Sequence, residues 1–268
     1  MKKLIFCDID GTIIDGARGM DFPSEKTKYA FKELTKENYV FIASGRNKAL
    51  VPDFIKDLKP NGYVLCNGAY AEVNNKPLFT KTFAKNDIAK LSDYVLSNNG
   101  FVILESVDNV YCDSFENKAF KLFTQTWGLA LKGFNNYKKE TIANEDFSIS
   151  MVGFLSESDC LDMEEAIKDF ADNARHKQFL SYDINIKGID KGYAVKKVIE
   201  LLQIPFENTY AFGDAVNDIE MLNAVKHPVM VANHAEEMKN LNFELTDDVL
   251  DDGFYNYLVL NKLIKPLQ

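Results

Sequence analysis

Residues 4–12 read Leu4-Ile5-Phe6-Cys7-Asp8-Ile9-Asp10-Gly11-Thr12, so an apolar run leads directly into two acids and a glycine. This order is typical of a buried β-strand that ends in a sharp polar turn. Asp8 and Asp10 are two residues apart, and on a strand their side chains would share one face. Two carboxylates ~4 Å apart repel each other by about 4 kcal/mol at an effective dielectric constant of ~20. A divalent metal is the simplest positive partner for this pair, although Asp-Gly is also a common turn dipeptide.

Four further apolar runs have the character of parallel strands that are buried on both faces. They cover residues 40–43, 63–66, 210–212 and 229–232. Helical patterns alternate with them, because apolar residues recur at helical spacing after Ser24 and again between Gly192 and Pro205. This alternation predicts an α/β protein with a doubly wound, mostly parallel sheet.

The middle of the chain has a different pattern. Residues 101–105, 110–113 and 148–155 resemble pieces of hairpins interleaved with helices. One of these helices is predicted to carry on one face Met163, Ile167, Phe170, Ala171 and Ala174. The sequence therefore predicts a core domain formed by residues 1–81 and 185–268, and an α+β domain inserted at residues 82–184.

The composition is that of an ordinary globular protein. The 268 residues carry a formal net charge of −9, whereas a protein that binds a phosphate backbone needs a basic surface. No uncharged apolar run approaches the ~18 residues of a membrane span, and the apolar stretch at the N-terminus is too short for a signal peptide. The cysteines form no CxxC pair, so we expect buried thiols in a reducing, cytoplasmic compartment.

Polar residues follow every predicted strand. After Asp8 and Asp10 come, strand by strand, Ser44-Gly45-Arg46, Asn67-Gly68, Gly213-Asp214 with Asn217-Asp218, and Asn233. Any one of them could be a turn or a helix cap, but ligands of open α/β sheets bind at the carboxyl ends of the strands. Lys191 could join them from the start of a predicted helix. Carboxylates without histidine suit Mg²⁺, and serine, lysine and backbone amides suit phosphate, so this edge predicts phosphoryl transfer.

The motifs at this edge resemble those of the haloacid dehalogenase (HAD) superfamily over nearly the whole chain. The segment Asp8-Ile9-Asp10-Gly11-Thr12 is similar to the first motif, Ser44-Gly45-Arg46 to the second, Lys191 with Gly192 to the third, and residues 213–218 to the fourth. Asn67-Gly68-Ala69 and the insert at 82–184 resemble the Cof-type subfamily IIB with its C2B cap. The resemblance implies a Rossmann-like core sheet with an inserted α+β cap domain.

The resemblance also implies chemical roles for the acids. Asp8 would be the nucleophile that forms an aspartyl-phosphate, and Asp10 would protonate the leaving group and then activate water. Mg²⁺ would be held by Asp8, the backbone carbonyl of Asp10 and Asp214. Asp218 would either ligate the metal or support a residue that does.

Other motif residues would hold the substrate. The resemblance assigns the phosphoryl oxygens to the amide of Ile9 and to Ser44, Gly45, Lys191 and Asn217. Arg46 would contact substrate or only pair with a surface acid, and Asn67 would contact substrate or only form a turn. The leaving group would be selected by polar and aromatic cap residues, of which the candidates include Tyr111, Asp113, Tyr137 and Tyr182.

Together these patterns predict a Mg²⁺-dependent phosphomonoester hydrolase for small phosphorylated metabolites: sugar phosphates, or flavin or pyridoxal phosphates. Two alternatives stay open, a phosphohexomutase and a phosphometabolite-binding regulator that has lost turnover. The presence of both Asp8 and Asp10 disfavours the regulator, because binding alone needs no acid/base residue. Other phosphatase chemistries lack their residues, since the sequence has no Cys-x5-Arg, no GxxxxGK[ST] loop and no GxSxG elbow. Neither a membrane nor a nucleic acid is an expected partner.

Overall fold

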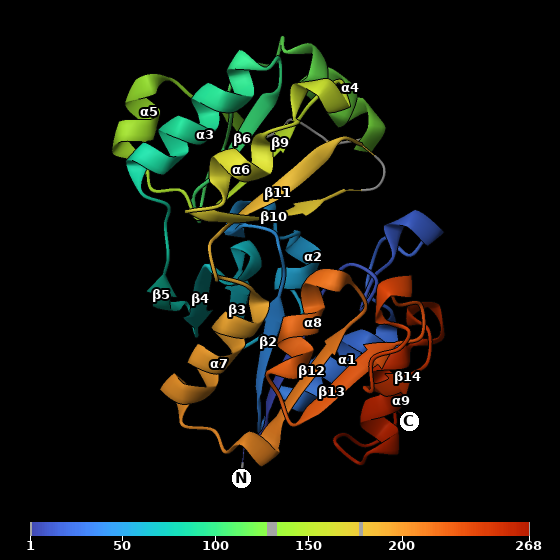
Figure 1. The fold of residues 1–268 in the computed structure, drawn as a ribbon. Coiled ribbons are helices and arrows are strands. Elements are labelled where there is room, and N and C mark those ends of the chain that lie inside the picture. The colour runs from blue at the N-terminus through green and yellow to red at the C-terminus, as the bar shows by residue number, and fades with distance from the viewer. Residues whose placement is uncertain (1, 128–132, 177–178, 268) are drawn as a thin grey trace. The chain divides into compact units, whose positions relative to one another are not determined.

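The computed structural model describes residues 2–127, 133–176 and 179–267. The chain divides into two compact units (Figure 1). Unit 1 comprises Met1–Gly45, Val51–Phe79 and Asp190–Gln268, and unit 2 comprises Arg46–Leu50 and Thr80–Ile189. Unit 1 is therefore assembled from three separate segments of the chain.

Unit 1 is built on a sheet that has eight strands among the described residues, in the order β14-β13-β12-β1-β2-β3-β4-β5. The strands are β1 (Leu4–Cys7), β2 (Tyr39–Ala43), β3 (Gly62–Leu65), β4 (Tyr70–Val73), β5 (Lys76–Thr80), β12 (Thr209–Gly213), β13 (His227–Val231) and β14 (Glu244–Thr246). Neighbouring strands from β14 to β3 run parallel, and β4 turns back antiparallel to β3. The predicted mostly parallel sheet is confirmed.

The strand β1 lies between β2 and β12 in the middle of this sheet, and all of its residues are buried. A central position with both faces covered explains why its sequence is apolar without alternation. The five strands expected from apolar runs all form, each within two residues of its expected bounds. The sequence does not predict β4, β5 and β14. The strands β5 and β14 are largely exposed and present no buried apolar run, and β4, although mostly buried, is interrupted by Glu72.

Helices cover both faces of the sheet in unit 1 (Figure 1). They are α1 (Glu25–Leu34), α2 (Asp53–Lys56), α7 (Lys191–Leu202), α8 (Ile219–Asn223) and α9 (Gly253–Leu260). On one face, α7 and α8 join an apolar cluster that includes Val195 and Phe6. On the other face, α1 and α9 meet through Phe31 and Phe254, whose ring centroids are 5.4 Å apart, and Phe254 packs on Phe212 of β12. The fold is thus doubly wound, as predicted.

Unit 2 contains a sheet with the order β10-β11-β9-β6-β7-β8 among its described residues. Its strands are β6 (Phe101–Glu105), β7 (Val110–Cys112), β8 (Phe134–Asn136), β9 (Ile149–Gly153), β10 (Ala171–Arg175) and β11 (Ser181–Ile186). Its helices are α3 (Lys85–Ser97), α4 (Lys118–Trp127), α5 (Lys139–Asn144) and α6 (Met163–Ile167). Most pairs are antiparallel, and only β7 with β8 is parallel among the pairs described. Unit 2 has the α+β character expected of the insert.

The helix predicted to carry Met163 through Ala174 is wrong in its second half. The helix α6 ends at Ile167, and Ala171 and Ala174 belong to the strand β10. This strand pairs antiparallel with β11, and that pairing satisfies its backbone hydrogen-bonding groups. Its sequence contains no β-branched or aromatic residue, so the contact with β11 overrides a local helical preference.

The short segment 46–50 leaves the first unit and packs within the second. The side chain of Asn47 is fully buried there, and its Nδ2 donates to the carbonyls of Ser106 at 2.9 Å and Asn109 at 3.1 Å. Its Oδ1 accepts from the amide of Leu50 at 3.0 Å. These bonds explain why Arg46, although it directly follows Gly45, belongs to unit 2.

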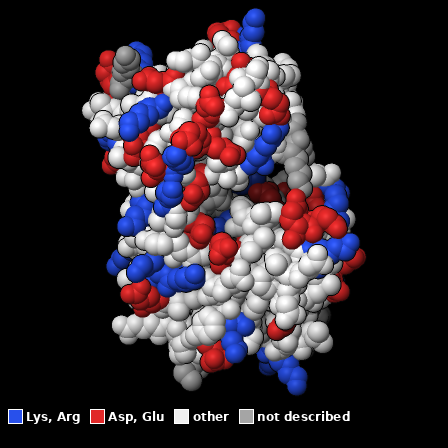
Figure 2. Space-filling model, in the orientation of Figure 1, with Lys and Arg blue, Asp and Glu red and all other residues white. Residues whose placement is uncertain are grey.

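The surface carries both signs of charge. On the face drawn in Figure 2, lysine and arginine side chains lie among aspartates and glutamates rather than in one continuous basic area. All four cysteines are buried, as expected. Among the helices of the described residues, none combines the length and the apolar character that crossing a membrane requires.

Candidate active site

The segment after β1 forms a tight turn. The carbonyl of Ile9 accepts from the amides of Thr12, Ile13 and Ile14, at 3.3, 3.0 and 3.2 Å respectively. Asp8 is buried, with 6% of its surface exposed, whereas Asp10 lies in the turn and is exposed. Because β1 ends at Cys7, the two acids do not share a strand face as predicted. The carboxylates that crowd Asp8 come from another strand end.

Asp8 gathers with Asp214 and Asp218, which follow β12. One carboxylate oxygen from each of the three lies within 4.8 Å of the other two. Lys191, 1% exposed at the start of α7, enters the same cluster. Its Nζ donates to Asp8 Oδ1 at 2.7 Å and to Asp218 Oδ1 at 2.6 Å. The structure thus brings together the first, third and fourth motifs found in the sequence.

Local backbone geometry holds Lys191 in place. The helix α7 is capped by Asp190, whose Oδ1 accepts from the amide of Tyr193 at 2.7 Å. Gly68 lies directly against this cap, because a Cβ at Gly68 would be 1.9 Å from the carbonyl oxygen of Asp190. Cys66 and Asn67 precede it with φ of 54° and 47°, in the left-handed region that costs such residues ~1–3 kcal/mol. This strained loop lets β3 reach the start of α7.

The two acids after β12 are held by different partners. Asp218 Oδ2 accepts from the amides of Asp214 and Ala215, both at 3.0 Å, so this buried carboxylate also shapes the loop. Asp214 Oδ1 accepts from Thr12 Oγ1 at 2.7 Å. Gly11, with φ of +85°, packs on the same carboxylate, since a Cβ there would be 2.0 Å from Asp214 Oδ2. The turn after β1 therefore packs closely against the carboxylate of Asp214.

A second group of predicted residues lies at the ends of β2 and β3. The amide of Asn67 donates to the carbonyl of Ser44 at 3.3 Å. Gly45 approaches Asn67 closely, because a Cβ on Gly45 would be 2.9 Å from Asn67 Oδ1. Asn217 Nδ2 donates to that same oxygen at 3.3 Å. The structure thus brings Ser44, Gly45, Asn67 and Asn217 together, whereas Arg46 lies in unit 2, where its Nη1 donates to the carbonyl of Leu50 at 3.4 Å.

The charges of the acid cluster do not balance. Three carboxylates and one ammonium group leave two negative charges in excess when all are ionised. Burial, and then the charge of Asp218, raises the pKa of Asp8 well above its usual range and that of Asp214 to about 7. Burial lowers the pKa of Lys191, but the charges of Asp218 and Asp8 raise it by more than burial lowers it. The net pKa is therefore raised, and the lysine stays charged. An oxygen-rich cluster with this excess fits a divalent cation such as Mg²⁺.

We expect the metal-free protein to become less stable as the pH rises from about 5 to about 8. The pKa of Asp214 is about 7 in the folded protein and 3.8 in the absence of its surroundings. Between these values the folded state binds more protons than the unfolded state, so rising pH favours unfolding, by at most ~4 kcal/mol for this group. Thermal melts across this pH range, with and without saturating Mg²⁺, measure the effect.

That experiment needs one control variant, because a second buried acid contributes to the same slope. Glu105 of unit 2 is also buried, which raises its pKa to about 8, and it contributes in the same direction. Asp214→Asn should therefore flatten only part of the slope. A melting temperature that rises with pH over this range in metal-free buffer would contradict the charge imbalance described above.

The structure also shows a polar residue whose part in the site the sequence does not reveal. Asn233 follows β13 at the same sheet edge, and its Nδ2 donates to the carbonyl of Gly11 at 2.8 Å. Its position after a predicted strand was the only signal in the sequence, and that signal is equally compatible with a turn. The contact itself depends on tertiary structure.

The suggested cap residues make packing contacts and hydrogen bonds within unit 2. Tyr111, Tyr137 and Tyr182 all contribute to the apolar cluster of unit 2, and Tyr182 is only 6% exposed. Asp113 Oδ1 accepts from the amide of Val102 at 2.8 Å, which ties β7 to β6. The sequence could not separate packing from recognition here, because aromatic residues serve both.

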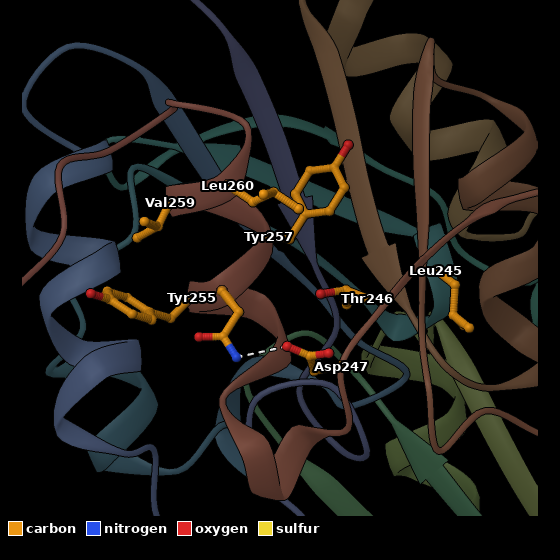
Figure 3. Close-up of a pocket in the computed structure, with 8 residues that line it drawn as sticks. Leu245, Thr246, Asp247, Tyr255, Tyr257, Val259 and Leu260 are labelled. Carbon is orange, nitrogen blue, oxygen red and sulfur yellow. Dashed lines mark hydrogen bonds between the residues drawn. The ribbon is translucent and has the colours of Figure 1, made fainter.

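A hollow lies between β14 and α9, well apart from these motifs in the sequence (Figure 3). Its polar side chains are satisfied within unit 1: Asn256 Nδ2 donates to Asp247 Oδ2 at 2.8 Å, Tyr257 to Glu244 Oε2 at 2.6 Å and Thr246 to the carbonyl of Gly253 at 2.7 Å. None of the predicted site residues lines it. The acid cluster at the end of β1 remains the candidate active site.

Comparison with known proteins shows the family to which the chain belongs. The family model described as haloacid dehalogenase-like hydrolase matches residues 5–258. A relative from Bacillus subtilis (strain 168), the putative phosphatase YkrA, is 30% identical over 258 residues, which cover 94% of this chain and 95% of that protein.

Solved structures share the fold over nearly the whole chain. A hypothetical protein from Geobacillus kaustophilus HTA426 has a TM-score of 0.87 at 23% identity, covering 98% of this chain and 100% of that one. The HAD subclass IIB sugar phosphatase BT4131 has a TM-score of 0.82 at 22% identity, with the same coverage of 98% and 100%. At these identities the likeness shows a Rossmann-like core with a cap.

Proposed function

The chain belongs to the haloacid dehalogenase-like hydrolase family, and from this premise we propose that it is a Mg²⁺-dependent phosphatase of small phosphorylated metabolites that works through an aspartyl-phosphate. The observation that carries the proposal is the buried cluster of Asp8, Asp214 and Asp218 around Lys191, with its excess negative charge. Such a cluster would weaken a fold that had no use for it, because buried like charges are costly.

Asp8 is the proposed nucleophile. One of its carboxylate oxygens attacks the phosphorus, the bond from phosphorus to the leaving oxygen breaks, and an aspartyl-phosphate forms. Lys191 donates to Asp8 Oδ1 at 2.7 Å, so the attacking carboxylate has a fixed orientation. The same ammonium group would compensate negative charge on a phosphoryl group that Asp8 attacks.

Asp10 is the proposed acid and base. It gives its proton to the leaving oxygen in the first step, and in the second it takes a proton from the water that attacks the phosphorus. The bond between Asp8 and phosphorus then breaks and phosphate leaves. Its exposure on the turn, in contrast to the buried Asp8, supports this role, because the acid must meet both the leaving group and water.

The proposed metal and phosphate ligands are those that the resemblance to the family implies. We propose that Asp8, Asp214 and the carbonyl of Asp10 hold Mg²⁺, and that Asp218, which is bound to Lys191, supports them. Bound there, Mg²⁺ would supply positive charge that offsets the negative charge of the phosphoryl group. The phosphoryl oxygens would be held by the amide of Ile9 and by Ser44, Gly45, Lys191 and Asn217.

We further propose that unit 1 is the catalytic domain and unit 2 a cap that selects the leaving group, with boundaries near those expected at residues 81 and 185. Sugar phosphates are the substrate class that we favour, because BT4131, which shares the fold, is described as a sugar phosphatase. Arg46 and Asn67 remain candidates for contacts with substrate. Buried thiols support a reducing, cytoplasmic location.

The proposal is tested by phosphate release from a panel of sugar phosphates, flavin mononucleotide and pyridoxal phosphate, with Mg²⁺ and with EDTA. We expect release that stops with EDTA and returns with Mg²⁺, and the ranking of substrates identifies the preferred leaving group. Full activity without metal would refute the metal site. A folded protein that binds Mg²⁺ and hydrolyses none of the panel would refute the phosphatase and point to the mutase or the regulator.

Asp10→Asn is expected to lower kcat by about 10²- to 10³-fold, because its proposed role is proton transfer, and to change the melting temperature less than a substitution of the buried Asp8 does, because Asp10 is exposed. Steady-state kinetics on the best substrate of the panel measures this. For a substrate whose leaving group needs no proton, such as p-nitrophenolate, the substitution should lower the rate of the first step less. An unchanged kcat on every substrate would remove Asp10 from the mechanism.

A further inference from the structure

We propose that Asn233 is a positioning residue that fixes the turn carrying Asp10, an inference that rests on the phosphatase reaction proposed above. Its half-buried side chain makes two hydrogen bonds to the backbone of two other segments. Nδ2 donates to the carbonyl of Gly11 at 2.8 Å, and Oδ1 accepts from the amide of Val249 at 3.0 Å. One amide group thus ties the turn after β1 to the loop before α9.

The bond to Gly11 acts at a crowded place. Gly11 packs on the carboxylate of Asp214, where a Cβ would lie 2.0 Å from Oδ2, and Thr12 Oγ1 donates to Oδ1 of the same group at 2.7 Å. A hydrogen bond that holds the carbonyl of Gly11 therefore also sets how closely residues 10–12 approach Asp214. Both the acid Asp10 and the proposed metal ligand Asp214 depend on this approach.

The backbone next to Asn233 binds Asp214, which is the other partner in the contact with the turn after β1. The amide of Ala235 donates to the carbonyl of Asp214 at 2.7 Å, so the segment 233–235 binds the loop after β12 as well as the turn after β1. The loop that anchors Asn233 is itself tied down, since Arg18 Nη1 and Nη2 each donate to Asp248 at 2.9 Å. Asn233 therefore connects two anchored segments rather than two free ones.

Loss of this amide should alter catalysis more than folding. Both described hydrogen bonds of the Asn233 side chain go to backbone groups, and a displacement of ~1 Å in a catalytic group can cost ~10²-fold in rate. Without the donor on Nδ2, the carbonyl of Gly11 loses a fixed partner and the turn gains freedom. Both kcat and the affinity for Mg²⁺ should then fall.

The test compares Asn233→Ala with the matched control Asn256→Ala. Asn256 Nδ2 also makes two hydrogen bonds at 2.8 Å, to Asp247 Oδ2 and the carbonyl of Asp251, in the same region but without contact to Gly11. For Asn233→Ala we expect kcat ~10- to 100-fold lower, a Kd for Mg²⁺ about tenfold higher by calorimetry without substrate, and faster hydrogen exchange over residues 8–20. All three should stay near wild type in Asn256→Ala.

A folded Asn233→Ala variant with kcat, Mg²⁺ affinity and exchange within about twofold of wild type would overturn the inference. Should the alanine variant not fold, Asn233→Asp decides, since it keeps the acceptor for Val249 and lacks the donor for Gly11. It is judged by kcat and exchange, because its added charge changes Mg²⁺ affinity directly. Calorimetry and exchange need no turnover, so a wild type that hydrolyses nothing would refute the phosphatase while these measurements still judge Asn233.

Discussion

Asp8→Asn is expected to reduce phosphate release by at least ~10⁴-fold while the metal-free protein melts at a higher temperature than wild type. The loss follows because an amide cannot form the acyl-phosphate that the proposed reaction requires. The gain in stability follows from the structure. Burial and the neighbouring Asp218 make the charged form of Asp8 unfavourable, as its raised pKa indicates, and the amide removes that charge without changing the volume.

Phosphate release and melting temperature must both be measured for this variant. The melting temperature is measured at neutral pH in metal-free buffer. Asp53→Asn is a suitable control, because Asp53 is an exposed residue at the start of α2 that pairs with Lys56 at 3.1 Å. It should change neither activity nor stability by a measurable amount. Substantial turnover by Asp8→Asn would remove the nucleophile from the mechanism, and a lower melting temperature would contradict the excess of negative charge at the site.

Lys191→Met is expected to destabilise the metal-free protein by about 3–5 kcal/mol, besides lowering kcat by at least ~10²-fold. The methionine has a similar length but no charge, so Asp8 and Asp218, which are 6% and 0% exposed, would stay buried without the ammonium group. Lower pH should restore part of the stability, because the carboxylates of Asp8 and Asp218, which have lost their ammonium partner, can then bind protons. Saturating Mg²⁺ should also restore part of the stability, because its positive charge replaces that of the lysine while the carboxylates stay ionised.

A matched control lies further along the same helix. Lys197 is 45% exposed and pairs with Glu200 at 2.8 Å, and its replacement by methionine should cost no more than about 0.5 kcal/mol. Chemical denaturation of both variants, in metal-free buffer at neutral pH, measures the difference between them. Equal stabilities would mean that the buried ion pairs of Lys191 do not balance the acid cluster.

The sequence predicted the strands and motifs of unit 1 well because one local rule governs them. A parallel strand covered on both faces must be apolar, and a polar residue directly after it lies at the binding edge of the sheet. That rule identified β1 and β12 and the acids that follow them in the sequence. It failed for β5 and β14, whose exposed positions put no such demand on the sequence.

The remaining differences arise from tertiary contacts. Asp8 and Asp10 have the spacing of one strand face, but the chain turns after Cys7, so Asp8 meets Asp214 and Asp218 instead. Ala171 and Ala174 fit a helix by spacing, yet pairing with β11 makes them a strand. Asn233 contacts Gly11, 222 positions away, and no local pattern encodes such a pair.

The division of unit 1 into three segments has a consequence for synthesis on the ribosome. Asp8 and Lys191 are 183 positions apart, and Thr12 and Asp214 are 202 apart. The central strand β1 is made early, but its neighbour β12 follows only after both segments of unit 2, so one edge of β1 has no partner for most of translation. Such long-range pairing is slow and leaves apolar strands exposed to aggregation. In the nascent chain, closure of the sheet and neutralisation of Asp8 by Lys191 therefore belong to the same late stage of folding.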